Sequence, residues 1–312
     1  MIKIFVACHK PTYVLDNKLL YPIQVGAALA KERLPGMLPD DDGDNISSKN
    51  RIYCELTAQY WAWRNCEAEY YGFFHYRRYL SFAEAYEVDP RGKLRTKKNI
   101  CPYIELDDIR EDLSAYKLQE SMMEEVIRNY DMITVLRERI NVSVYKQYCQ
   151  YHDSRPLDTV LHILNEKYPQ YQKAVQTYMD SRDIYYMNMF IMKRSLYMEY
   201  ASWLFDILET YERSEAFPQN EYEVNRLMGY LAERLFGVFY TYQREHGITC
   251  AELPYLKFYN TDLEQTSHTV GNIRVFQLKP TKLKIKIDMR KVNKMFPAGS
   301  KRRILLRNIF LR

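Results

Sequence analysis

The chain has 312 residues, enough for one large domain or two smaller ones with a substantial hydrophobic core. Hydrophobic residues make up 47% and charged residues 27%, which argues against a disordered chain. Mean hydropathy is −0.48 and no apolar run reaches about 18 residues, so the sequence predicts no transmembrane helix. The first residues lack the pattern of a secretory signal, and we expect a cytoplasmic protein.

Positive charge is concentrated near the C-terminus. Residues 271–312 contain 13 Lys and Arg residues against one acid, so this segment carries +12 and residues 1–270 carry −7. The last twelve residues mix cations with Ile, Leu and Phe, a composition typical of a helix that docks on anionic lipid. We therefore expect peripheral binding to the inner face of the cell membrane and no nucleic-acid partner. A solvated tail or a subunit contact, as in a homodimer, is the alternative.

Apolar periodicity predicts strands that alternate with helices. The expected elements are a strand at 2–7, a helix from Ser47 or Ser48 to 65, strands at 70–74 and 130–135, helices over 141–180 with breaks near Pro156 and Pro169, a strand at 184–192, and helices at 195–211 and 221–245, the last ended by Gly247. Residues 86–117 are charged and irregular, as in an insertion or lid. This alternation predicts a layered α/β domain.

The predicted strand at 70–74 is followed directly by His75-Tyr76-Arg77-Arg78. Ligands of α/β sheets bind at the carboxyl ends of strands, and arginine binds phosphate oxygens through two hydrogen bonds. The segment therefore predicts a site for a diphosphate. The alternative is that the two arginines pair with carboxylates such as Asp107 or Asp108.

A second candidate segment, residues 44–50, opens a predicted helix whose free N–H groups favour an anion. The carboxylates just before and within it could instead bind a divalent metal or simply be solvated. They are Asp40, Asp41, Asp42 and Asp44.

In the last long predicted helix, Glu223, Arg226, Tyr230 and Glu233 recur at spacings that place them on one face. A carboxylate beside an arginine could serve as a general base kept ionised by its neighbour. A solvent-facing ladder of ion pairs is the other interpretation.

Several common motifs are absent. The sequence contains no glycine-rich phosphate loop, no G-x-S-x-G, no H-E-x-x-H and no C-x-x-C pair among its six cysteines. P-loop kinases, dinucleotide oxidoreductases, α/β-hydrolases and zinc proteases are therefore disfavoured.

Seven short motifs follow one another along the chain: 44–50 (DNISSKN), 53–57 (YCELT), 60–63 (YWAW), 72–79 (GFFHYRRY), 188–193 (NMFIMK), 203–208 (WLFDIL) and 229–235 (GYLAERL). In this order they resemble a bacterial family long described as a domain of unknown function. Members of that family occur in capsule, exopolysaccharide and O-antigen gene clusters, and they include β-galactofuranosyltransferases.

The resemblance implies a truncated GT-A-like fold with a helical C-terminal part and a basic tail. It implies inverting transfer of a hexose, with galactofuranose as the first choice, from a UDP-sugar to a lipid-linked glycan. Most GT-A enzymes hold a metal through Asp-x-Asp, but that position here is taken by residues 75–78. Two cations could replace the ion, so Mg²⁺ or Mn²⁺ stays open as a cofactor and no metal ligand is assigned.

The candidate site residues follow from these motifs and predicted strand ends. Those expected to bind the donor are His9, Lys10, Asn45, Ser47, Asn50, His75, Tyr76, Arg77, Arg78 and Asn188. Glu233 is the predicted base and Asp183 the second choice, ahead of Asp131 and Glu223. Glu223, Arg226 and Tyr230 are expected to support the acceptor.

We expect a GT-A-like domain over residues 1–250 and a C-terminal extension with a membrane-docking tail over 251–312. A non-catalytic subunit that binds a sugar or lipid carrier would have the same fold and tail without the base. A nucleotidyltransferase is a third alternative, disfavoured by the missing glycine-rich loop.

Overall fold

The computed structural model describes residues 1–83, 103–263, 267–270, 273–278 and 283–288. Its centre is a mixed sheet in the order β11-β7-β10-β4-β1-β2-β3. The strands are β1 (Ile2–Cys8), β2 (Leu20–Gln24), β3 (Leu38–Pro39), β4 (Tyr70–His75), β7 (Met132–Val135), β10 (Phe190–Lys193) and β11 (Cys250–Leu253). Of these seven, β10 is antiparallel to both its neighbours, and the other pairs are parallel.

The sheet is extended beyond β4 by a turn. His75 at the end of β4 pairs with Arg78 at the start of β5 (Arg78–Leu80), so Tyr76 and Arg77 form the tip of a two-residue hairpin. β12 (Tyr255–Asn260) pairs with β5 on one side and with β6 (Tyr103–Asp108) on the other. The sheet thus continues past the predicted domain limit at residue 250.

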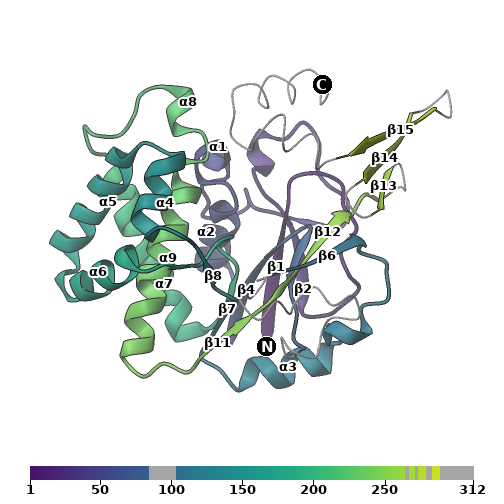
Figure 1. Ribbon diagram of the computed structural model, residues 1–312, viewed down its shortest axis with the longest axis horizontal. Coiled ribbons are helices and arrows are strands. Elements are labelled where there is room, and N and C mark those ends of the chain that lie inside the picture. The colour runs from purple at the N-terminus through teal and green to yellow at the C-terminus, as the bar shows by residue number, and fades with distance from the viewer. Residues whose placement is uncertain (84–102, 264–266, 271–272, 279–282, 289–312) are drawn as a thin grey trace.

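Aromatic side chains attach one helical layer to the sheet. Phe5 packs edge-on against Trp61 of α2 (Leu56–Asn65), and Phe73 contacts Tyr197 of α7 (Arg194–Glu212). Phe190 of β10 stacks on Phe236 of α9 (Leu227–Glu245). Figure 1 shows α7 and α9 gathered with α4 (Val144–Tyr151), α5 (Ser154–Lys167) and α6 (Gln172–Asp180) on one side of the molecule.

The remaining elements are short or peripheral. They are α1 (Asn50–Tyr53), α3 (Glu120–Arg128), α8 (Glu221–Val224), the ribbon of β8 (Glu138–Arg139) with β9 (Asp183–Ile184), and the meander of β13 (Ser267–Val270), β14 (Ile273–Leu278) and β15 (Leu283–Asp288). Short 3₁₀ turns occupy Ala27–Leu29, Ser47–Lys49, Ser114–Tyr116 and Pro169–Tyr171. The meander lies at the opposite end of the molecule from the helical layer (Figure 1).

Most predicted elements are confirmed, with shifted ends. The strands at 2–7, 70–74 and 130–135 correspond to β1, β4 and β7, and the helix at 195–211 corresponds to α7. The helices over 141–180 break before Pro156 and at Pro169. Gly247 follows the end of α9 with φ +84°, a conformation that suits glycine. Of the predicted irregular segment 86–117, residues 103–108 form β6 and residues up to 102 lie outside the described part.

Three predicted elements are wrong because each is interrupted by residues with left-handed backbone. The helix from Ser47 or Ser48 to 65 is divided at Cys54 (φ 53°) into α1 and α2. The strand at 184–192 is divided between β9 and β10, with Met187 at φ 84° and Asn188 at φ 49°. The helix at 221–245 is divided into α8 and α9 by Arg226 (φ 63°).

The predicted membrane-docking helix at 301–312 lies outside the described residues. Within the part of the chain that the structure describes, no helix is both long enough and apolar enough to cross a membrane.

Candidate functional site

The carboxyl ends of β1 and β4 bring three of the predicted donor-binding residues, His9, Lys10 and Tyr76, together. β1 rises from the N-terminus toward α1 in Figure 1, and His9 and Lys10 follow it directly. The His9 ring meets the Tyr76 ring edge-on at 4.9 Å, and Lys10 Nζ lies 5.6 Å from the centre of the Tyr76 ring. Lys10 also pairs with Asp262 at 2.6 Å. Tyr76 at the tip of the hairpin thus packs against the loop after β1.

Arg77 and Arg78 supply half-buried positive charge beside these rings. The Arg77 guanidinium lies 5.6 Å from the Tyr76 ring centre. The Nε atoms of Arg77 and Arg78 are buried without a hydrogen-bond partner among the described residues. Asp108, one predicted alternative partner, instead pairs with Arg110 at 3.0 Å and accepts a hydrogen bond from Asn260. The two arginines therefore hold donor capacity that an anionic ligand would satisfy.

Glu233 reaches the same region from α9. Its Oε1 accepts the backbone N–H of Met187 at 2.8 Å, and its Oε2 lies 3.4 Å from Arg234 Nη1. The backbone oxygen of Met187 in turn lies 2.7 Å from His75 Nε2. One residue of the loop before β10 thus connects the predicted base to the end of β4.

Glu55 is a site residue that the sequence analysis did not select. It lies between α1 and α2, and its Oε1 accepts Asn188 Nδ2 at 2.8 Å. Its negative charge raises the pKa of both His75 and Glu233. The available signal was its position within the motif at 53–57.

Arg226 and Tyr230 border the site from the loop before α9 and its first turn. Arg226 is exposed, its guanidinium lies 5.6 Å from the Tyr230 ring centre, and its charge acts on His9. The half-buried Tyr230 ring lies 4.3 Å from the ring of His152, which follows α4. This border therefore combines a cation with two aromatic rings.

The surroundings of the site keep its two histidines neutral and its arginines charged. Partial desolvation, then the positive charges of Lys10, Arg77 and Arg226, lower the pKa of His9. Burial lowers the pKa of His75, partly offset by Glu55, so both imidazoles are neutral near pH 7. Burial and the neighbouring Arg77 also lower the pKa of Arg78, which still remains protonated.

Glu233 has the opposite balance. Burial raises its pKa, the adjacent Arg234 and the Met187 N–H oppose that rise, and the Glu55 charge adds to it. A carboxylate with a raised pKa binds a proton more readily than an ordinary one, as a general base must.

The predicted donor-binding residues of the 44–50 segment lie in the scaffold of a loop. The buried Asp40 carboxylate accepts the backbone N–H groups of Gly26 and Ala27, at 2.8 and 2.9 Å, and the hydroxyl groups of Ser47 and Thr57. Asn45 and Asn50 likewise donate to backbone oxygens within the same region. These hydrogen bonds hold the side chains of Asn45, Ser47 and Asn50 within the loop.

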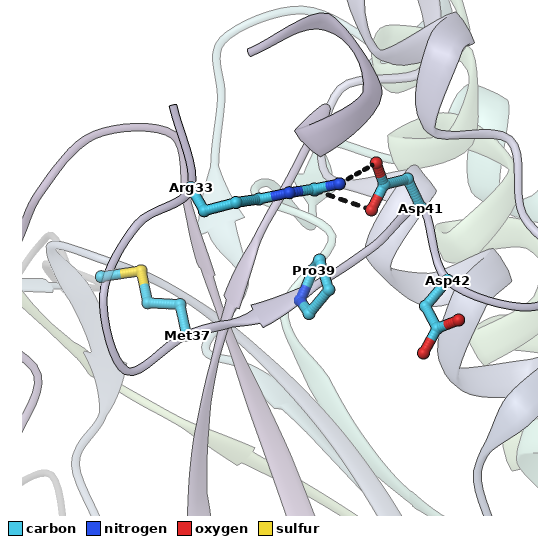
Figure 2. A pocket seen from close by; sticks show the side chains of 5 residues that line it. All are labelled: Arg33, Met37, Pro39, Asp41 and Asp42. Atoms are coloured by element: carbon cyan, nitrogen blue, oxygen red, sulfur yellow. Dashed lines mark hydrogen bonds and ion pairs between the residues drawn. The ribbon is translucent and has the colours of Figure 1, made fainter. Parts of the chain in front are cut away.

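A separate open cavity of about 360 Å³ lies at the end of β3. Figure 2 shows Arg33 held by two hydrogen bonds of 2.7 Å to Asp41, with Asp42, Met37 and Pro39 around it. With its arginine neutralised and a further carboxylate on its wall, this cavity repels a diphosphate. Of the two places, the hairpin is the better match for an anionic ligand.

The other candidate carboxylates are engaged elsewhere. Asp131 pairs with Lys193 at 2.6 Å. Lys193 lies beside Tyr70, the first residue of β4, so this pair is at the other end of β4 from His75. Asp183 pairs with Arg139 at 3.0 Å in the β8–β9 ribbon. Glu223 is exposed on α8, so the predicted single face shared by Glu223, Arg226, Tyr230 and Glu233 is wrong. Among the described residues, no three His, Cys, Asp or Glu side chains are grouped so as to hold a metal ion.

The fold and the position of the site define a GT-A-like α/β protein with its cationic site at the carboxyl ends of the central strands. The chain belongs to the family described as "Domain of unknown function (DUF4422)", which matches residues 3–245. It is also similar to the apo structure of the WbbM bifunctional glycosyltransferase, with 30% sequence identity and a TM-score of 0.75 over 90% of this chain. The match covers 47% of the WbbM chain, so this chain spans about half of its length. None of the curated proteins matches the sequence.

Proposed function

We propose that this chain is a glycosyltransferase of polysaccharide synthesis that transfers a hexose from a UDP-sugar to a lipid-linked glycan. The observation that carries the proposal is the joining of cations to a carboxylate at the carboxyl ends of β1 and β4. Arg77 and Arg226 both act on His9 through their charge, Arg77 and Arg78 act on His75, and Glu233 is connected to His75 through the backbone of Met187. Cations suit a diphosphate leaving group, and a carboxylate suits an acceptor hydroxyl. The likeness to the WbbM bifunctional glycosyltransferase supports the same class of reaction.

In the proposed step, Glu233 takes the proton of the acceptor hydroxyl as its oxygen bonds to the anomeric carbon. The bond between that carbon and the diphosphate oxygen breaks, and UDP leaves with the electron pair. Arg77, Arg78 and Arg226 stabilise the negative charge that develops on the leaving group. Attack from the face opposite the diphosphate inverts the anomeric configuration, and a β-linked galactofuranose is the product we expect first.

The acceptor side of the site is proposed to be aromatic. Tyr230 is one turn before Glu233 on α9, and its half-buried ring lies beside His152. An aromatic ring offers an apolar face to a sugar ring and a polar edge to its hydroxyl groups. We further propose that residues 271–312, with charge +12, hold the enzyme on anionic membrane at the cytoplasmic face, where lipid-linked acceptors reside.

The direct test is turnover of purified protein. UDP-galactofuranose and a panel of UDP-hexopyranoses are each incubated with a synthetic lipid-linked acceptor, in Mg²⁺, Mn²⁺ or EDTA. Product with at least one donor supports the proposal, and the EDTA arm measures metal dependence. Tight binding of UDP without turnover of any donor would instead favour a non-catalytic sugar-binding subunit, and absence of both would reject a UDP-sugar site.

A further inference from the structure

The loop before β10 contains two consecutive non-glycine residues in the left-handed region. Met187 has φ 84° and Asn188 has φ 49°. Such residues cost on the order of 1–3 kcal/mol each and persist where surrounding contacts impose them. The contacts around this turn must therefore be specific.

Three separate elements supply those contacts to Asn188, whose side chain is 2% exposed. Its Nδ2 donates to Glu55 Oε1 at 2.8 Å and to the backbone oxygen of Gly229 on α9 at 3.1 Å. Gln59 Nε2 on α2 donates to the backbone oxygen of Asn188 at 3.2 Å. Asn188 is among the residues predicted from the sequence to bind the donor, but it is buried and its amide nitrogen is engaged by Glu55 and Gly229. We therefore treat Asn188 as an internal anchor and not as a donor contact.

The anchored turn presents the Met187 backbone to two ionisable side chains of the site, Glu233 and His75. The Met187 N–H donates to Glu233 Oε1 at 2.8 Å, and its carbonyl oxygen lies 2.7 Å from His75 Nε2. Because a carbonyl oxygen only accepts hydrogen bonds, Nε2 carries the proton of the neutral His75 ring, and Nδ1 is left as an acceptor. The turn therefore sets both the orientation of Glu233 and the tautomer of His75.

We infer that Glu55 and Asn188 are positioning residues that hold the Met187–Asn188 turn in its left-handed form and so aim Glu233 at the acceptor hydroxyl. Neither residue is assigned contact with the reacting atoms. The inference rests on the proposed function for its effect on turnover, whereas its effect on the turn is independent of any activity.

The test compares disruptive with conservative variants. Glu55→Ala removes the acceptor for Asn188, whereas Glu55→Gln keeps an oxygen there. Asn188→Ala removes both side-chain hydrogen bonds at a φ unfavourable to alanine, whereas Asn188→Gly accepts that φ. Lys117→Ala is the matched control, because Lys117 is also left-handed (φ 52°) but follows the 3₁₀ turn Ser114–Tyr116.

Glu55→Ala and Asn188→Ala are expected to lower kcat by roughly 10–100-fold, the scale expected when a reacting group is misplaced by about 1 Å. UDP affinity should stay unchanged, Glu55→Gln should restore most of kcat, and Asn188→Gly should lose less than Asn188→Ala. By NMR, exchange of the Met187 amide hydrogen should accelerate in both alanine variants, and His75 should change from the Nε2–H tautomer to a mixture.

Unchanged Met187 exchange and an unchanged His75 tautomer in both alanine variants would overturn the inference, whatever the activity. Equal losses of UDP affinity and kcat would overturn it too, because they assign these residues to donor binding. If the wild-type protein turns over no donor while the NMR changes appear as expected, the proposed function fails and the role of Glu55 and Asn188 in the turn stands.

Discussion

The backbone nitrogen of Arg226 donates to the backbone oxygen of Arg51 at 2.8 Å, which ties the left-handed residue before α9 to α1. The two helices meet at a second point, where Gly229 of α9 faces Cys54: a Cβ on Gly229 would lie 3.5 Å from the Cys54 Sγ. Cys54, which separates α1 from α2, and Arg226, which separates α8 from α9, thus lie in the same contact region. Glu55, which contacts Asn188, directly follows the break at Cys54, and Arg226, whose guanidinium lies by the Tyr230 ring, is itself the break before α9.

Replacement of Arg226 separates its backbone role from its charge. Alanine is strained at φ 63° and glycine is not, so Arg226→Gly should be more stable than Arg226→Ala by about 1 kcal/mol. Both variants lose the guanidinium and should weaken UDP binding to a similar extent. Urea unfolding measures the first difference and calorimetry the second. An alanine variant as stable as the glycine variant would show that this backbone conformation is not required in solution.

Arg77 and Arg78 are expected to bind the donor diphosphate. Alanine at either position should weaken UDP binding by roughly 1.5–3 kcal/mol, the range for a charge-assisted hydrogen bond. The control is Arg128→Ala. Arg128 is exposed at the end of α3 and pairs with Glu124 and with Glu69, the residue just before β4. Calorimetric affinities that are unchanged in both hairpin variants, with the fold intact, would show that the diphosphate binds elsewhere.

Much of the fold could be predicted because its signals are local. β1 is apolar apart from Lys3, and β4 is apolar up to His75, as expected of strands buried on both faces. Gly247 supplies the backbone freedom that ends α9. The hairpin arginines were predictable for the same reason, since they directly follow a buried strand.

The bends of the site could not be predicted from local pattern. Cys54, Asn188 and Arg226 have no intrinsic preference strong enough to announce a left-handed break in an otherwise periodic segment. Their conformations depend on partners far along the chain, such as Gly229 for Asn188 and Arg51 for Arg226. The same bends separate Glu223 from Glu233, so the periodicity that favoured a shared helix face was misleading.

Asp131 should contribute to stability rather than to turnover. Hydrogen bonds from Lys193 and then Thr249 lower its pKa to about 2. Because the folded pKa lies below the unfolded value of about 3.9, the contribution is complete above that value and is lost as pH falls toward 2. Asp131→Asn should therefore lower the free energy of unfolding at pH 7 by about 1–2 kcal/mol, allowing for partial solvent screening.

Urea unfolding of wild type and Asp131→Asn across this pH range measures the effect. The two proteins should converge in stability near pH 2, while turnover at pH 7 stays at the wild-type rate. A stability difference that is the same at pH 7 and pH 2 would mean that the Asp131 charge is not its source. A large loss of turnover in a stably folded variant would contradict its placement away from the site.

The basic C-terminal segment is expected to bind anionic membrane. Truncation after residue 288 retains β13–β15 and removes eight Lys and Arg residues. Each cation near such a surface contributes about 1 kcal/mol, so the truncated protein should lose most of its binding to phosphatidylglycerol vesicles and keep its turnover on a water-soluble acceptor. Replacement of Lys301, Arg302 and Arg303 by Gln is a milder variant that should weaken binding partly. Equal vesicle binding by all three proteins would reject the role of the tail.

Glu233 is expected to act as the base. Glu233→Gln keeps the shape and the hydrogen bond from Met187 but cannot take a proton, so turnover should fall by about 10²–10⁴-fold while UDP affinity stays unchanged. Burial raises the pKa of Glu233, and the Glu55 charge adds to this rise, whereas Arg234, the Met187 N–H and Arg226 oppose it. The wild-type rate should therefore decline on the acid side at a pH above the usual range for glutamate.

Glu245→Gln is the matched control on α9, because Glu245 pairs with Lys173 at 3.2 Å, away from the hairpin. A folded Glu233→Gln enzyme with near wild-type turnover would place the base elsewhere, and Asp183→Asn would be the next variant to measure.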